Sequence, residues 1–215
     1  MATPLQSILV ANPKGGSGKS TLATNLAGHF AWAGERTMLG DIDRQQSSLR
    51  WLQRRPDNLP AIQGWDVEPD EPAKPPKGTT RVVLDTPAGL HGKKLAQVLK
   101  LVGRIIVPVQ PSAFDMWASE DFFAQLAEEK AVRKQQAFIA VVGMRVDART
   151  RAAQQLEAFL AGFDLPVLTY LRETQLYVQL AGQGLTLFDM PRSKTERDRA
   201  QWQPLVDWLR TPIVG

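Results

Sequence analysis

The chain has 215 residues, of which 43% are apolar and 22% charged, as in one ordinary globular domain. It has no cysteine and no apolar run near the ~20 residues that cross a bilayer, which excludes disulfides, thiolate metal sites and a membrane span and predicts a cytoplasmic protein. The net charge of +4 permits a polyanionic partner but does not require one.

Short runs of apolar residues alternate with longer segments of helical period. Strands are predicted at residues 7–11, 37–42, 81–84, 104–109, 137–143 and 166–170, and helices at 19–33, 92–101, 115–131, 149–161, 175–181 and 195–209. This order is typical of an α/β fold with a mainly parallel central sheet and helices on both faces, which we expect to form a single domain over residues 1–215. Residues 56–78 hold six of the fifteen prolines and predict a surface excursion with one short strand near residues 62–67.

A glycine-rich segment follows the first predicted strand and opens the first predicted helix, as a phosphate-binding loop requires. Its glycines let backbone N–H groups converge on phosphate oxygens, and the helix N-terminus adds partial positive charge. Lys19 would reach the β- and γ-phosphates, Ser20 would offer its hydroxyl to Mg²⁺, and Thr21 would bond the α-phosphate. The expected nucleotide-binding residues are Lys14, Gly15, Gly16, Ser17, Gly18, Lys19, Ser20 and Thr21.

This loop departs from the usual G-x-x-x-x-G-K-[ST] pattern, because Pro13 takes the first glycine position and an extra cation, Lys14, precedes the double glycine. With Lys-Gly-Gly-x-Gly-Lys-Ser the chain resembles the ParA/MinD family of deviant Walker-A ATPases, and most closely the small ParA-type ATPases without an N-terminal helix-turn-helix domain. The resemblance implies a P-loop NTPase fold of the SIMIBI type and a homodimer with two ATP molecules sandwiched between its subunits. In that dimer Lys14 would reach the partner's nucleotide, as an arginine finger supplied in trans does.

Acidic residues follow two further strands. Asp41 and Asp43 are two residues apart, which places both carboxylates on one face at the carboxyl edge of the sheet. The resemblance matches Asp43 to the residue that orients the attacking water. It implies that Asp41 supports the ligands of the magnesium ion without binding the ion itself. Arg44 stands where the family has proline. The resemblance also matches Asp85 to the acid that holds Mg²⁺ through water, and Gly89 to a switch residue that senses the γ-phosphate.

These motifs contain no histidine or glutamate that could act as a strong general base. Catalysis would therefore rest on positioning and electrostatics, with Lys14, Lys19 and Asp43 as the catalytic residues. We expect slow basal hydrolysis of ATP, stimulated by an adaptor protein that is ParB-like or bound to a cargo. Residues 144–147 lack the Asn/Thr-Lys-x-Asp pattern of related GTPases, which favours ATP with Mg²⁺ as the cofactors.

Cations gather towards the C-terminal end, where the resemblance places arginines that bind double-stranded nucleoid DNA. The candidate DNA-binding residues are Arg172, Arg192, Lys194, Arg197 and Arg199, with a second cluster at Arg145, Arg149 and Arg151. Phosphate contacts of this kind carry no base preference. The resemblance implies that the ATP-bound form associates with the nucleoid. A solvated helix face explains the same charges, because Glu196 and Asp198 lie among them.

The expected function is an ATP-dependent dimerising ATPase that binds non-specific DNA and partitions or positions a plasmid, a chromosome locus or a protein assembly. Two alternatives stay open: a MinD-like membrane-associated spatial regulator, and an assembly ATPase that acts without DNA. The membrane alternative needs a free apolar helix face, and an apolar stripe recurs at helical spacing in Trp202, Leu205, Val206 and Leu209. We expect this stripe to pack on the core. For Trp117 we also favour core packing over the alternative, a contact with a dimer partner or another protein.

Overall fold

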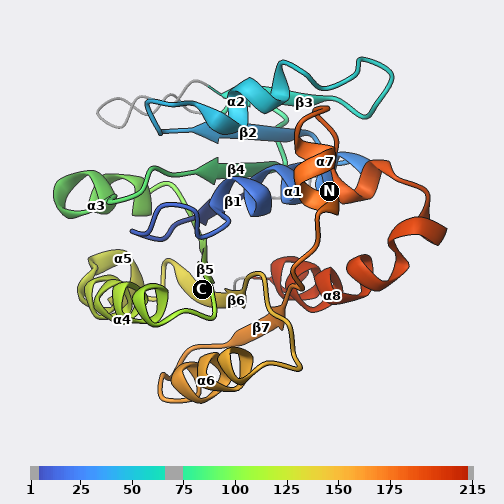
Figure 1. Cartoon of the computed structure of the whole chain (residues 1–215). Coiled ribbons are helices and arrows are strands. Elements are labelled where there is room, and N and C mark those ends of the chain that lie inside the picture. The colour runs from blue at the N-terminus through green and yellow to red at the C-terminus, as the bar shows by residue number, and fades with distance from the viewer. Residues whose placement is uncertain (1–4, 66–74, 213–215) are drawn as a thin grey trace.

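The computed structural model describes residues 5–65 and 75–212 (Figure 1). Their strands form a seven-stranded sheet in the order β3-β2-β4-β1-β5-β6-β7, and every neighbouring pair is parallel. This confirms the α/β prediction. The strands are β1 (Gln6–Val10), β2 (Thr37–Asp41), β3 (Ile62–Trp65), β4 (Arg81–Asp85), β5 (Arg104–Val109), β6 (Phe138–Gly143) and β7 (Val167–Tyr170).

Helices cover both faces of this sheet, because its buried strands alternate their side chains between two apolar clusters. In β1, Leu9 belongs to the cluster beneath α3, α4 and α6, and Ile8 and Val10 to the cluster beneath α1 and α8. The helices are α1 (Lys19–Trp32), α2 (Ser47–Leu52), α3 (Gly92–Leu99), α4 (Ala113–Glu128), α5 (Lys130–Arg133), α6 (Arg151–Leu160), α7 (Leu176–Ala181), the 3₁₀-helix η1 (Leu187–Asp189) and α8 (Arg192–Arg210).

Three short elements go beyond the predicted helices. α2 and η1 have six and three residues, too few for a helical period to show in the sequence, and α5 is a separate turn after α4. The short strand expected near residues 62–67 is β3 at one edge of the sheet, whereas residues 66–74 of the proline-rich excursion lie outside the described residues.

Helix α8 buries the apolar stripe near the C-terminal end, as expected. Trp202 and Leu205 are 0% exposed, Val206 and Leu209 are almost as buried, and the Trp202 indole N–H donates to the Tyr177 hydroxyl over 2.8 Å. In the described part of the chain, none of the helices combines the length and apolar character needed to traverse a bilayer. The apolar face of α8 is therefore part of the core.

The expectation for Trp117 was wrong, because its side chain is 59% exposed. Helix α4 packs on the sheet through Ser119, Phe122 and Leu126, which follow one another at three- and four-residue spacing. Trp117 lies on the opposite side of the helix and so faces solvent.

Replacing a core residue of α8 tests the packing of this helix. We expect Leu205→Ala to lower the free energy of unfolding by about 2–5 kcal/mol, because it removes buried methyl groups and leaves a cavity. Gln203→Ala, on the exposed face of the same helix, should change it by less than about 0.5 kcal/mol. Urea unfolding followed by circular dichroism measures both. Equal stabilities of the two variants would show that α8 is not held in the core.

Candidate nucleotide site

The candidate site lies where β1, β2 and β4 end side by side. Val10 at the end of β1 is the register partner of Asp85 at the end of β4, and Asp85 is also the partner of Asp41 on β2. Because all three strands are parallel, their carboxyl ends share one edge of the sheet, where open α/β sheets bind ligands. The sheet order therefore brings the glycine-rich loop and two acidic residues together from three parts of the chain.

Left-handed glycines shape the loop between β1 and α1. Gly16 has φ 78° and Gly18 has φ 100°. At Gly18 the restriction is also steric, since a Cβ there would lie 2.7 Å from the Met144 Cε atom. A side chain at either position would strain the backbone, and at Gly18 it would also press against the loop after β6.

The polar groups of this loop fit a bound phosphate chain. The Ser17 hydroxyl is buried without a hydrogen-bond partner among the described residues, and the space around Gly15 and Gly16 is open. The Lys19 ammonium donates to the Lys14 carbonyl over 2.8 Å. Burial lowers the pKa of Lys19, while the charges of Asp85 and Asp43 raise it. Phosphate oxygens are acceptors that both the hydroxyl and the ammonium would bind.

Two buried carboxylates face the loop, and a residue that the sequence prediction missed connects them. The Ser48 hydroxyl donates to Asp85 Oδ2 over 2.6 Å, and the Ser48 backbone N–H donates to Asp41 Oδ2 over 2.8 Å. Ser48 is completely buried at the start of α2. The pair Ser47-Ser48 is a helix-start signal, but the contact with Asp85 spans 37 residues and could not be read from the sequence.

The pKa of Asp85 is raised to about 6, chiefly by burial and also by the charge of Asp41, against the hydrogen bonds from Ser20 and Ser48. The pKa of Asp41 is raised by burial too, against the backbone N–H groups of Asp43 and Ser48. Among the described residues, no group of three acidic, His or Cys side chains could hold a metal alone. These residues instead fit Mg²⁺ that keeps water and phosphate ligands, with the Ser20 hydroxyl beside Asp85.

The two expected switch residues lie in loops around this pocket. The Asp43 carboxylate accepts from the Gln45 backbone N–H over 3.0 Å and so turns towards its own loop. The Gly89 N–H donates to the Pro13 carbonyl over 3.0 Å, with φ 76° at Gly89. The second switch is therefore bonded directly to the residue before Lys14. A phosphate that competed for the Gly89 N–H would break this bond.

Lys14 is held by residues that the sequence prediction missed. Its backbone N–H donates to the buried Asn12 side chain over 2.8 Å, and that side chain donates to the Pro108 carbonyl and to the Ser119 hydroxyl. The Lys14 ammonium lies 5.5 Å from the centre of the Phe114 ring. The loop is thus attached to β5 and α4 at the position of its extra cation.

The candidate DNA-binding residues fall into two groups. Arg172 forms a bidentate pair with buried Asp198 at 2.7 and 3.0 Å, and Arg199 donates to the Phe188 and Met190 carbonyls. Both arginines therefore hold the fold together. The other members are exposed: Arg192, Lys194 and Arg197, with Arg145, Arg149 and Arg151 of the second cluster.

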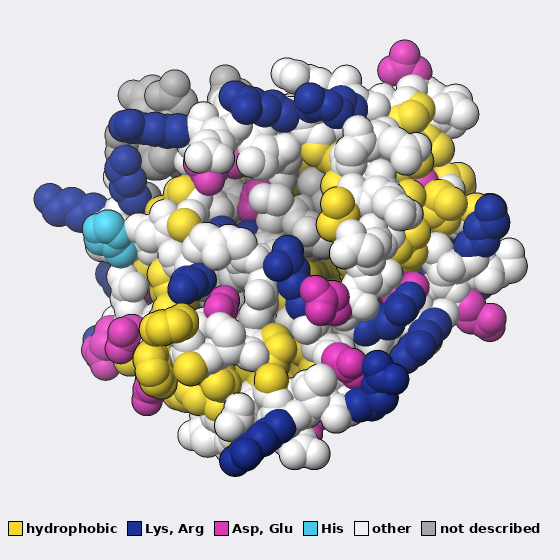
Figure 2. Space-filling model, viewed as in Figure 1, with side chains coloured by type: hydrophobic (Ala, Val, Ile, Leu, Met, Phe, Trp, Pro, Cys, Tyr) yellow, Lys and Arg dark blue, Asp and Glu magenta, His cyan; other side chains and the backbone are white. Residues whose placement is uncertain are grey.

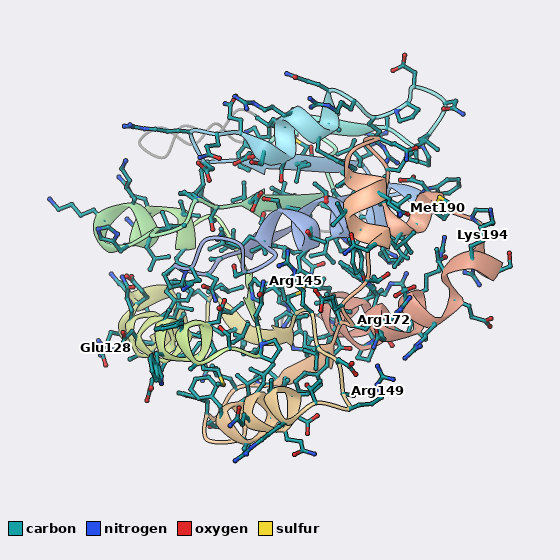
Figure 3. All side chains as sticks on the ribbon, in the orientation of Figure 1. Glu128, Arg145, Arg149, Arg172, Met190 and Lys194 are labelled. Atoms are coloured by element: carbon teal, nitrogen blue, oxygen red, sulfur yellow. The ribbon has the colours of Figure 1, made fainter. Side chains whose placement is uncertain are left out.

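In Figure 3, Arg149, Arg172 and Lys194 lie on one side of the molecule, away from Glu128 on α4. Arg149 is 89% exposed and pairs with Asp147 at 2.9 Å. Arg145 has φ 55°, which is unusual for a residue with a side chain. The basic side of the molecule is thus distinct from the face of α4.

Comparison with known proteins agrees with this geometry. Residues 8–187 match the family model "CobQ/CobB/MinD/ParA nucleotide binding domain". The maintenance of carboxysome distribution protein A of Gloeobacter kilaueensis is 30% identical over 201 residues, covering 89% of this chain and 87% of that protein. The chromosome-partitioning ATPase Soj of Thermus thermophilus is 27% identical over 186 residues, covering 71% of this chain and 74% of Soj.

Solved structures share the fold. A putative plasmid partition protein of Borrelia burgdorferi, bound to AMPPNP, aligns with a TM-score of 0.73 at 16% identity and covers 95% of this chain and 99% of its own. Other structures with the same fold hold ATP or Mg-ADP.

The pH dependence of magnesium binding tests the role of Ser48. We expect Mg²⁺ binding to need the Asp85 carboxylate, so Mg²⁺-dependent binding of a fluorescent ATP analogue should weaken as the pH falls through about 6. Ser48→Ala removes a hydrogen bond that lowers the pKa of Asp85, so the midpoint should move to higher pH and the Mg²⁺ affinity at pH 7 should fall. Ser47→Ala, at the exposed neighbour, is the control. An unchanged midpoint in Ser48→Ala would contradict this role.

Proposed function

Because this chain belongs to the CobQ/CobB/MinD/ParA family of nucleotide-binding domains, we propose that it is a Mg²⁺-dependent ATPase that pairs when it binds ATP and positions a cargo on DNA. The observation that carries the proposal is the second lysine of the loop. Lys19 is buried and bonded inside the loop, whereas Lys14 is only half-buried and its ammonium lies over the exposed Phe114 ring. Lys19 is thus available for the nucleotide bound by its own chain, and Lys14 for a nucleotide bound by a second copy.

Hydrolysis in this proposal depends on position rather than on a strong base. Lys19 and the N–H groups of residues 15–21 bind the phosphates, and Asp43 orients the attacking water. Asp85 and Asp41 hold the waters of Mg²⁺, which would neutralise charge on the β- and γ-phosphate oxygens when bound. Lys14 of the second copy stabilises the charge that develops on the transferred phosphoryl group. Slow basal turnover follows, since among the described residues no histidine or glutamate side chain is hydrogen-bonded to the loop.

The relatives support a positioning role. The curated relative with 30% identity is named for carboxysome distribution, Soj is named a chromosome-partitioning ATPase, and the Borrelia protein is named for plasmid partition. Proteins named for three different cargoes thus share one nucleotide-binding domain. We propose that this chain likewise moves one cargo, recognised through an adaptor that also stimulates hydrolysis, on the nucleoid in the cytoplasm.

DNA binding is the part of the proposal that rests on the basic side of the molecule. Arg192, Lys194 and Arg197 are exposed at the start of α8 and have no ion-pair partner among the described residues. Their charges are available to phosphates, and pairing of two copies would double the contacts. Arg172 and Arg199 would instead support this surface through their bonds to Asp198 and η1.

Burial of the α8 stripe weighs against the membrane alternative, since its apolar residues already pack in the core. The alternative of an assembly ATPase without DNA is distinguished by experiment. Turnover measured with and without duplex DNA at two salt concentrations separates the two functions.

Lys14→Ala tests pairing through the nucleotide. We expect the variant to bind ATP as a monomer about as well as wild type, but to lose the ATP-dependent dimer and at least about tenfold in turnover, because the second copy's phosphates lose a cation. Lys100→Ala, at an exposed lysine on a different part of the chain, should leave both properties unchanged. Light scattering after gel filtration with Mg²⁺ and AMPPNP measures pairing. Wild-type pairing and turnover in Lys14→Ala would refute the proposal.

A triple variant tests DNA binding. We expect Arg192→Ala/Lys194→Ala/Arg197→Ala to weaken binding of a random-sequence duplex and to reduce the salt dependence by about one unit of slope per lost phosphate contact. The control, Lys130→Ala/Arg133→Ala/Lys134→Ala on α5 and the residue after it, removes the same charge from exposed positions elsewhere. Fluorescence anisotropy at several salt concentrations gives both slopes. Equal losses in the two variants would show a general charge effect and no DNA-binding surface on α8.

A further inference from the structure

The first turns of α4 carry an exposed aromatic pair. Phe114 is 68% and Trp117 is 59% exposed, and their rings meet edge to face with centres 5.5 Å apart. Figure 2 shows hydrophobic side chains gathered over the region where Figure 1 draws α4. Exposed aromatic residues that touch one another are typical of an interaction surface rather than of scattered surface apolar groups.

A groove of about 540 Å³ continues this surface between α4 and α6. Met116, Phe159 and Phe163 form its apolar lining, and Glu120 and Gln155 are its polar residues. Further along the exposed side of α4 lie Asp121 and Glu128. An apolar centre with charged residues at its margin is the usual composition of a protein interface.

The aromatic pair is joined to the loop that carries the proposed cross-dimer lysine. The Lys14 ammonium lies over the Phe114 ring, and the Asn12 side chain connects the Lys14 backbone to Ser119 on the buried side of α4. Lys14 thus contacts α4 through its side chain, and its backbone is linked to α4 through Asn12. A second molecule whose bound nucleotide contacts the Lys14 ammonium must therefore also come close to Phe114.

We propose that Phe114 and Trp117 form the apolar centre of the surface on which a second copy of this chain docks. This inference rests on the proposed pairing through Lys14. A standard interface covers about 800 Å² on each partner, which corresponds to a radius of about 16 Å. Trp117 touches the ring that Lys14 touches, so both aromatic residues fall well inside that radius around Lys14.

Phe114 has a second part in this arrangement, as a positioning residue for Lys14. A cation over an exposed aromatic ring is held weakly, so the ring can keep the ammonium at the surface and still release it to the stronger charge of a triphosphate. Docking of the second copy covers Phe114 with protein and supplies that triphosphate. The same aromatic pair would therefore both form the contact and present the lysine to it.

The test compares dimer dissociation constants, measured by analytical ultracentrifugation of the full chain with Mg²⁺ and AMPPNP. We expect Trp117→Ala and Phe114→Ala each to weaken pairing at least tenfold, while AMPPNP binding by the diluted monomer and the melting temperature stay at wild-type values. Trp117→Phe keeps an aromatic ring and should recover most of the affinity. Val178→Ala, at a side chain 64% exposed on α7, is the matched control and should pair as wild type does.

The outcomes separate this inference from the proposed function. A wild-type dimer that Trp117→Ala and Phe114→Ala leave unchanged overturns the docking surface but keeps the proposed pairing. A wild-type chain that stays monomeric with AMPPNP overturns both. Unchanged pairing in these two variants, together with lost stimulation of turnover by an adaptor protein, would assign the surface to that protein and overturn its use by a second copy.

Discussion

Burial of two carboxylates beside a phosphate-binding loop is the constraint on which the rest of this site depends. Asp41 and Asp85 are 3% and 1% exposed, and they are register partners on adjacent strands. Like charges brought this close in a poorly solvated place are unfavourable without compensation. The compensation comes from the Ser48 hydroxyl, from backbone N–H groups and from the Lys19 ammonium, so the loop, the first switch and α2 are tied to one electrostatic centre.

That centre explains why a nucleotide would change more than its own pocket. The Gly89 N–H is bonded to Pro13, and Gln110 after β5 donates to the Gly16 carbonyl over 2.5 Å. Two N–H donors, of Gly89 and of the Gln110 side chain, thus bond to carbonyls of the loop. Exchange of these bonds for bonds to phosphate would move the segment that holds Lys14, and Lys14 is attached to α4 through Asn12.

The basic side of the molecule follows the same electrostatic rule. Asp198 and Asp189 have side chains 3% and 1% exposed, and each takes a bidentate arginine, Arg172 and Arg55 respectively. A buried carboxylate needs such a partner, so arginines that look available in the sequence are used inside the fold. The surface left for a polyanion is smaller than the count of cations suggests, and it centres on the exposed start of α8.

Local patterns in the chain predicted the strands and the longer helices, the glycine-rich loop with its two lysines, and the acids at the strand ends. Those features depend on local backbone preference, on hydrophobic period and on spacing within a few residues. Three features became visible only in the folded chain: Ser48 bridges Asp41 and Asp85, Arg172 and Arg199 support the fold, and Trp117 faces solvent. Each of these depends on which distant segments the parallel sheet brings together, and a contact across 37 or 26 residues leaves no local pattern in the chain.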